Sequence, residues 1–569
     1  MTGPLPHKAR RRGPKKPSPT SSQTTIVNVT SSTKGDAVAK APLFPLASFM
    51  WAARGSASEW EVLPLILMVV GLFRWAAGLW GYSGYHRGPV FGDYEAQRNW
   101  MEVTTQVPVS QWYFHDLQHW GLDYPPLTAY HSWVCGQIGS LINPVWFTLY
   151  VSRGSDDPAL KIFMRATVIV SEYLVYIPAA VVFVRRFSRF NGVSNWSASL
   201  ALVAFLMQPS TILIDHVHFQ YNTVMLGFVL ASMSSMVAGR YMWSAVFFVA
   251  ALGFKQMALY YAFSVFSYLL GSCVFPKLNV GRLGIDSRPN IDGPPPPLPL
   301  FPHLAEKLDT DAFYYPLVEQ LLQMVHRIFP FARGLFEDKV ANFWCALNVV
   351  VKLRNFAPEL QQGAALALTL ASIIPANLVL FFRPRKHLLP LGFAATAWGF
   401  FLFSFQVHEK SVLLPLMPMT LLLAGKQGLS RDTRAWVGFA NILGAWTMFP
   451  LLQRVDLRVP YAVLTLLWAY LLGLPPTSLS AYFQEGQSAW VQWGTALVHG
   501  VFYVAMAAWH VVEATVRPPI DKPDLWTVAN VGVGCVGFGL CYLWCMWQLF
   551  AQSGQLPVKA SSKSKKKSY

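Results

Sequence analysis

Five carboxylates lie between residues 92 and 126, in a chain with only 28 Asp and Glu among 569 residues. The stretch reads "GDYEAQRNWMEVTTQVPVSQWYFHDLQHWGLDYPP". Asp93 begins a predicted helix, where an acid is also common simply as a helix cap. Asp123 precedes two prolines, which restrict the backbone and hold the carboxylate in place. Two carboxylates in fixed positions suit general-base catalysis or a divalent cation.

The residues after Asp93 have a helical period. Glu95, Arg98 and Glu102 fall on one face and apolar residues on another, which predicts an amphipathic helix lying on the membrane. Together with Asp93, the two glutamates are also spaced suitably for a hard cation.

Two further segments place polar groups at the ends of apolar runs, "IDHVHFQYN" (214–222) and "FQVHEKSVLL" (405–414). Ionisable groups at that depth are costly and indicate function. The second segment lacks the second His of the H-E-x-x-H pattern, so a metalloprotease is excluded. For Asp215, His216 and His218, anchoring at the interface is favoured over metal binding. Lys255 ends another apolar run, where it could reach the interface or neutralise a phosphate.

The elements that hold these groups must be membrane helices. Hydrophobic residues make up 53% of the chain, charged residues 13%, and there are 22 Trp. Mean hydropathy is +0.35, which is typical of a polytopic membrane protein. Part of the net charge of +17 lies in basic clusters at both ends. Such clusters mark cytosolic segments, and no nucleic-acid-binding module is recognisable.

The sequence contains about thirteen apolar stretches of spanning length. Basic connectors at 185–190, 382–387 and 425–434 indicate the cytosolic side, together with both termini. Termini on one side require an even number of spans, so one span is missing. A Pro-rich segment stands where it should be, and we expect a lost helix there, through a gene-model error, or a segment at 312–330 that dips into the membrane.

These features divide the chain into six parts. They are a disordered basic cytosolic arm (1–58), a transmembrane half (59–276) with a lumenal loop (82–160), the Pro-rich segment (277–329), a lumenal loop (330–361), a second transmembrane half (362–551), and a basic cytosolic tail with a dilysine retrieval signal (552–569). Cys135 and Cys345 fall on the same predicted side, so a disulfide between them is an open alternative.

Several long motifs resemble one enzyme family. "FGDYEAQRNWMEVT", "WYFHDLQHWGLDYPPLTAY", "DHVHFQYN", "FKQMALYYA", "HRIFPFARGLFEDKVANFWC" and "FSFQVHEKSVLLPLMP" are similar to the dolichyl-phosphate-glucose-dependent α-1,3-glucosyltransferases of the endoplasmic reticulum. "GDYEAQR" and "LQHWGLDYPP" resemble the members that add the first glucose to the lipid-linked oligosaccharide, whereas the sister members add the second. Family members usually carry a span where this chain has the Pro-rich segment.

The resemblance implies an all-α polytopic GT-C glycosyltransferase fold with about fourteen spans and lumenal loop helices. It implies inverting transfer of glucose from dolichyl-phosphate glucose to the terminal mannose of a dolichyl-diphosphate-linked nine-mannose glycan. The carried-over base is Asp93, and the leaving phosphate is assigned to His408, Lys410 and Lys255. The residues assigned to substrate binding or orientation are Glu95, Arg98, Asp123, Asp338 and His218.

No cofactor is required by this reading, because the phosphate needs only positive charge; a divalent cation is the less favoured alternative. Arg98 or another nearby cation would keep Asp93 ionised. The expected location is the endoplasmic reticulum membrane, with a lumenal site and cytosolic termini. The sister glucosyltransferase, an inactive truncated member and a lipid transporter remain as alternatives; for the transporter, no internal repeat is evident.

Overall fold

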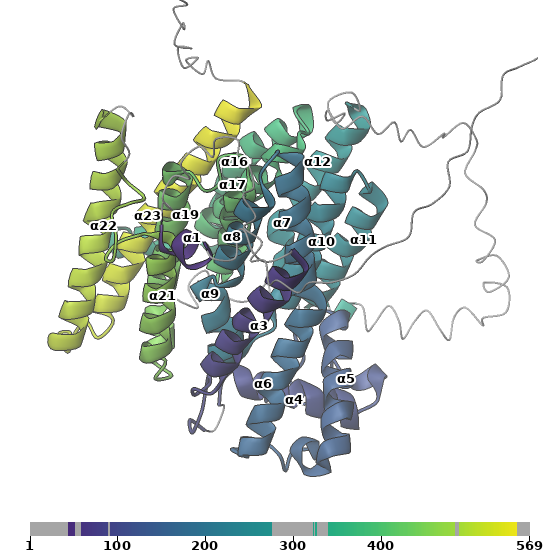
Figure 1. Ribbon diagram of the computed structural model, residues 1–569. Coiled ribbons are helices and arrows are strands. Elements are labelled where there is room, and N and C mark those ends of the chain that lie inside the picture. Colours follow the sequence, from purple (N-terminus) through teal and green to yellow (C-terminus); the bar gives the residue numbers. More distant parts are fainter. Residues whose placement is uncertain are drawn as a thin grey trace, which may run out of the picture. The chain divides into compact units, whose positions relative to one another are not determined.

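The computed structural model describes residues 44–51, 59–88, 91–275, 339–483 and 489–554, and four residues between 322 and 326. All regular structure within these ranges is helical, as predicted (Figure 1). The N-terminal half contains α3 (Glu59–Gly78), α4 (Asp93–Gln106), α5 (Pro126–Ile142), α6 (Pro158–Ser171), α7 (Ile177–Phe190), α8 (Asn195–Leu206), α9 (Pro209–Ile212), α10 (Asn222–Ala238), α11 (Tyr241–Phe254) and α12 (Ala262–Val274).

The C-terminal half begins after the Pro-rich segment. Its helices are α15 (Phe343–Val350), α16 (Pro358–Phe382), α17 (Leu389–Phe403), α18 (Leu413–Thr420), α19 (Arg431–Thr447), α20 (Phe449–Gln453), α21 (Arg458–Leu472), α22 (Ala489–Thr515) and α23 (Leu525–Ser553). Short 3-10 turns join several of them, including η9 (Glu409–Val412) before α18 and η5 (Gln256–Tyr261) after α11.

Six helices among the described residues are long and apolar enough to cross a bilayer, which confirms a polytopic membrane protein. A seventh is the bent pair Asn195–Leu206 and Pro209–Phe219, whose two parts meet at 41°. Three shorter apolar helices add to these. The estimate of about thirteen spans counted apolar stretches, whereas the structure breaks some of them into short helices; residues 411–425 become η9, α18 and a further 3-10 turn.

The break before Pro209 is followed by a π-helix, η4 (Leu213–Phe219), in which wider backbone hydrogen bonds replace those of an α-helix. A second π segment, η3 (Glu172–Tyr176), joins α6 to α7 within one long span. The backbone reaches a φ of +90° at Phe219, an uncommon conformation for a bulky residue. Irregular backbone of this kind is frequent at functional sites.

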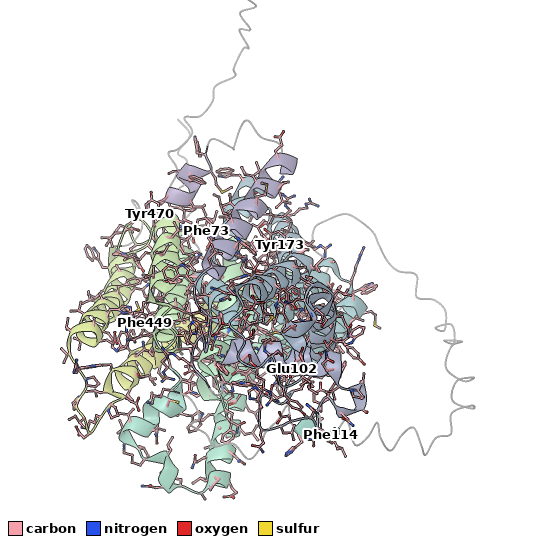
Figure 2. The ribbon with its side chains drawn as sticks, turned by 90° about the horizontal axis from the view of Figure 1, so that it is seen from below. Phe73, Glu102, Phe114, Tyr173, Phe449 and Tyr470 are labelled. Carbon is pink, nitrogen blue, oxygen red and sulfur yellow. The ribbon has the colours of Figure 1, made fainter. Side chains whose placement is uncertain are left out.

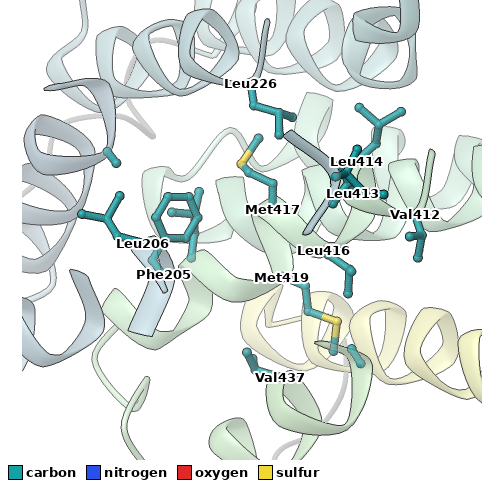
Figure 3. Packing of buried hydrophobic residues seen from close by; sticks show 14 of the residues in the cluster. Phe205, Leu206, Leu226, Val412, Leu413, Leu414, Leu416, Met417, Met419 and Val437 are labelled. Carbon is teal, nitrogen blue, oxygen red and sulfur yellow. The ribbon is translucent and has the colours of Figure 1, made fainter. Parts of the chain in front are cut away.

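The two halves share a continuous apolar core. Phe205 and Leu206 of α8 lie near α18 and α19, which contribute Leu416, Met417 and Val437 (Figure 3). All five side chains are at most 1% exposed. This packing fixes the segments on both sides of α18, and therefore the position of η9, which precedes it.

The first packed element begins earlier than the predicted boundary at residue 58. Residues Pro45–Phe49 form α1, in which Leu46 is buried, and α1 packs against α21. A few apolar side chains are enough to dock this short segment, although composition favoured disorder. Cys135 and Cys345 are free thiols, so the disulfide considered above is not formed. The Pro-rich segment at 277–329 and the dilysine tail lie outside the described residues, apart from the four noted above.

Candidate active site

Asp93 is the first residue of α4. The N-cap position belongs to Gly92, whose φ of +122° and close approach to Ser83 leave no room for a side chain. The Asp93 backbone N–H donates to Ser83 Oγ at 3.3 Å. Its carboxylate makes its contacts elsewhere, so the alternative interpretation of Asp93 as a helix cap is wrong.

The Asp93 carboxylate meets residues from two distant parts of the chain. Lys410 Nζ, from η9, donates to Oδ2, and Gln220 Nε2 donates to the same oxygen at 2.7 Å. His218 Nδ1 lies 3.4 Å from it. Among the described residues all these contacts go to Oδ2, which leaves Oδ1 available for a ligand. The Asp93 and Lys410 side chains are 21% and 22% exposed, so the pair remains accessible.

A second lysine lies behind this pair. Lys255 is buried between α11 and η5, and its Nζ donates to Asn222 Oδ1 at 2.6 Å and to Gln220 Oε1 at 3.4 Å. The Lys255 Nζ also lies 4.6 Å from the centre of the Tyr124 ring. Gln220 therefore bridges the two residues: its amide N–H donates to Asp93, and its carbonyl accepts from Lys255. This arrangement fixes the orientation of the amide.

Asn222 is held in turn by Asp215. The Asn222 Nδ2 donates to Asp215 Oδ1 at 2.8 Å, and the Thr223 N–H donates to Oδ2 at 2.6 Å. Asp215 and His218 are both buried, and their contacts lie within this cluster, so His218 is not an anchor at the interface. The chain Asp93, Gln220, Lys255, Asn222 and Asp215 links α4 to the broken span.

The charge of Asp93 is set by its neighbours. Burial by itself would raise the pKa of the Asp93 carboxyl, but the charge of Lys410 and the contacts with His218 and Gln220 hold it well below its usual value. The sequence suggested Arg98 or another nearby cation for this role; Lys410 fills it.

The face of α4 that was expected to point outward is buried. Arg98 donates from Nε to Glu95 Oε2 at 2.9 Å and from Nη1 to Ser152 Oγ at 2.7 Å, and its Nη1 lies 2.7 Å from Glu102 Oε2. The Tyr150 N–H donates to Glu102 Oε1 at 2.6 Å. The side chains of Glu95, Arg98 and Glu102 are at most 2% exposed, and Figure 2 labels Glu102 among the surrounding helices.

The predicted helix is thus present, and its polar face is covered by protein. Its polar residues form an internal cluster of ion pairs and hydrogen bonds, which is how buried charges are tolerated. Because Arg98 lies between Glu95 and Glu102, the three carboxylates considered for a cation do not converge. Within the described ranges no group of three His, Cys, Asp or Glu does.

The other predicted site residues differ in how close they lie to Asp93 and Lys410. Asp123 is half-buried before α5, within electrostatic range of Lys255. His408 is exposed at the N-cap of η9, two residues before Lys410. Asp338 lies outside the described residues. The structure thus brings Asp93, His218, Lys255 and Lys410 together.

A buried group of three residues, Arg74, Glu172 and His216, contacts the broken span. Arg74 of α3 donates from Nε to Glu172 Oε2 at 2.7 Å and from Nη2 to the Leu206 carbonyl at 2.8 Å. His216 Nε2 contacts the same oxygen of Glu172. Arg165 donates to the His216 carbonyl at 2.5 Å and to the Val217 carbonyl at 2.8 Å. Two arginines thus occupy carbonyls that the break and the π-helix leave without regular partners.

Replacement of Glu172 by Gln is expected to lower kcat by about 10- to 100-fold with little change in KM, because a small misplacement of the π-helix would displace Gln220 and His218. The change also removes one member of a buried ion pair, so thermal stability will fall. Asn441→Leu is the matched control, since Asn441 is a buried polar residue that bonds Gln208 and Thr420 away from the site. Equal losses of kcat per folded enzyme in both variants would contradict a positioning role.

Four side chains of the candidate site and its surroundings were not among the residues predicted from the sequence. Gln220 and Asn222 lie in "DHVHFQYN", whose string of polar residues between apolar runs was the available signal. Arg74 and Glu172 each interrupt an apolar stretch, which by itself indicates a buried partner. Their pairing across 98 positions could not be read from spacing.

The chain is similar to known glycosyltransferases over most of its length. The model of the ALG6, ALG8 glycosyltransferase family matches residues 70–547. A Schizosaccharomyces pombe protein, "Probable dolichyl pyrophosphate Man9GlcNAc2 alpha-1,3-glucosyltransferase", is 42% identical over 91% of this chain and 98% of its own length. The Saccharomyces cerevisiae protein "Dolichyl pyrophosphate Man9GlcNAc2 alpha-1,3-glucosyltransferase" is 40% identical over 90% of this chain and 96% of its own length. The Gallus gallus protein of the same name is 36% identical over 84% of this chain and 95% of its own length. The chain therefore belongs to the ALG6, ALG8 glycosyltransferase family.

Proposed function

We propose that this chain transfers glucose from dolichyl-phosphate glucose to the terminal mannose of the dolichyl-diphosphate-linked nine-mannose glycan, forming an α-1,3 bond in N-glycan precursor assembly. The acceptor and the bond are those in the names of its relatives. The donor is the one expected from the resemblance. The observation that carries the proposal is the accessible Asp93 carboxylate, paired with Lys410 through Oδ2 alone.

Asp93 is the proposed general base. Its Oδ1 accepts the proton of the mannose C3 hydroxyl as that oxygen attacks the anomeric carbon of glucose. The bond from the anomeric carbon to the phosphate oxygen breaks, and dolichyl phosphate leaves with the electron pair. A β-linked donor and an α-linked product require attack from the face opposite the leaving group, as in inverting glycosidases.

We propose that Lys410 changes its partner when the donor binds. Without substrate it pairs with Asp93. A donor phosphate offers a second anion to the same ammonium group, and we propose that Lys410 moves to it. Asp93 then loses the charge that depresses its pKa, while burial still disfavours the ionised form. The carboxylate becomes a stronger base when the donor is in place.

The remaining roles follow from position. Lys255 and His408 are proposed to add positive charge at the phosphate, and Asp123 and Asp338 to bind sugar hydroxyls. His218 orients Asp93, and Glu95 and Arg98 fix α4. We further propose that no divalent cation is needed, since lysine already neutralises the leaving group. The endoplasmic reticulum membrane, a lumenal site and cytosolic termini complete the proposal.

The decisive experiment uses the purified full chain in detergent or vesicles with dolichyl-phosphate glucose. Transfer to the nine-mannose acceptor, unaffected by a chelator, is the expected result, with an α-anomer in the product. Transfer only to an acceptor that already ends in glucose would assign the sister activity instead. Absence of transfer to either acceptor would reject the enzyme proposal, and lipid translocation in the same vesicles would favour the transporter alternative.

A further inference from the structure

A pocket lies away from Asp93. It is formed where α20 ends, α22 ends and α23 begins, and it has a volume of about 290 Å³. That size is near the lower end of ligand pockets, which begin at about 300 Å³. Its lining includes Gln453, Trp509, Glu513, Arg517, Trp526 and Thr527. The mechanism proposed above uses none of these residues.

The pocket faces the same side of the protein as the proposed active site. Gln453 ends α20, and the turn that follows carries Asp456, whose Oδ2 accepts from Arg87 Nη2 at 3.5 Å. Arg87 lies six residues before Asp93, the first residue of α4.

Internal hydrogen bonds hold the walls of the pocket. Trp509 Nε1 donates to the Trp526 carbonyl at 2.7 Å, and Trp526 Nε1 donates to the Val516 carbonyl at 2.8 Å. Gln453 Nε2 donates to Glu513 Oε1 at 2.5 Å. Since both indole N–H groups are already bonded, a ligand can meet only an apolar ring surface. Trp526, which is half-buried, offers that surface, because Trp509 is 7% exposed and packs against Trp446 and Phe449. A site preformed in this way loses little freedom on binding.

The chemistry of the lining matches a neutral sugar. A hexose has an apolar C–H face, which an indole ring covers, and an edge of hydroxyls, which need both donors and acceptors. The Glu513 carboxylate accepts, the Arg517 guanidinium donates and the Thr527 hydroxyl does either. Glu513 and Arg517 in one pocket also offset each other's charge, so neither sign of ionic ligand is favoured strongly.

We propose that this pocket binds a mannose residue of the acceptor glycan at a distance from the residue that receives glucose. The inference rests on the proposed function. The acceptor of the relatives carries nine mannoses, of which only one can meet Asp93, so the others must lie along the same side of the protein. Binding one of them at a fixed second point would hold the acceptor in one orientation and raise its affinity through the second contact.

The test compares two acceptors in the glucose-transfer assay. One is the nine-mannose glycan, and the other is trimmed to the arm that receives glucose. For Glu513→Ala combined with Thr527→Val, the KM of the full acceptor is expected to rise about tenfold, as for the loss of one hydrogen bond to a charged group. Its kcat at saturation and the KM of the trimmed acceptor should stay unchanged. Asp521→Ala is the control, since Asp521 is exposed in the same loop but does not line the pocket.

A binding measurement separates this inference from the transfer reaction. Free nine-mannose oligosaccharide is titrated calorimetrically into the full chain in detergent, as wild type and as the double variant. Loss of binding in the variant supports the pocket even if the wild type transfers no glucose. Equal binding by both proteins would overturn the inference, as would equal KM changes for both acceptors, which would assign the pocket to the shared lipid part.

Discussion

Replacing Asp93 by Asn should reduce kcat for glucose transfer by about 10²- to 10⁴-fold, the usual contribution of a general base. Asn can keep the hydrogen bond to Lys410 but cannot accept a proton at neutral pH. The donor should still bind, because its phosphate meets lysine and not Asp93. Single-turnover rates with saturating donor and acceptor measure the chemical step directly.

The control for this variant is Asp456→Asn. The Asp456 carboxylate is 86% exposed on the same side of the protein and pairs only loosely with Arg87, so transfer should stay within about twofold of wild type. A general base contributes at least about 10²-fold. If Asp93→Asn kept more than about a tenth of the wild-type kcat, the loss would be too small for a base, and Asp93 would be a structural residue.

Replacing Lys410 by Met should have two separable effects. The leaving phosphate loses one stabilising charge, which lowers kcat by about 10²-fold. The acidic limb of the pH profile of kcat/KM, which reports the free enzyme, should also move to higher pH. In the wild type the pKa of Asp93 is depressed below its ordinary value of 3.8, so the base stays ionised as pH falls. Without Lys410 the largest cause of that depression is gone, and burial is opposed only by the contacts with His218 and Gln220. The pKa of the carboxyl therefore rises, so activity is lost earlier on acidification.

The depressed pKa of Asp93 also affects how folding stability depends on pH. A depressed pKa means that the Asp93 pair contributes stability above pH 3.8 and loses it only as pH falls through the lower folded value. Lys410→Met removes this contribution, whereas Lys410→Arg keeps the charge and should keep the position of the acidic limb. Lys339→Met is a matched control, because Lys339 pairs with Asp524 outside the site. An unchanged pH profile in Lys410→Met would contradict the pairing.

The sequence could predict the class of fold and the polarity of the site. Long apolar runs require helices that satisfy their own backbone hydrogen bonds in lipid, so an all-helical membrane protein followed from composition and length. Lys255 was identifiable because charged groups are rare in such runs and stand out at their ends, whereas the roles expected for Asp93 and Lys410 came from the resemblance to the family. The helical period from Asp93 onward also predicted α4 correctly.

The tertiary structure decided which of these groups meet. Asp93 and Lys410 are 317 positions apart, and their contact depends on how α18 packs against α17 and α19, which no local pattern encodes. The same is true of α4, whose period predicted two faces but not that both would be covered. The break before Pro209 and the π-helix after it turn Gln220 and Asn222 into the site. Periodicity reports which face of a helix is apolar, whereas contacts between distant segments are fixed only when side chains pack together.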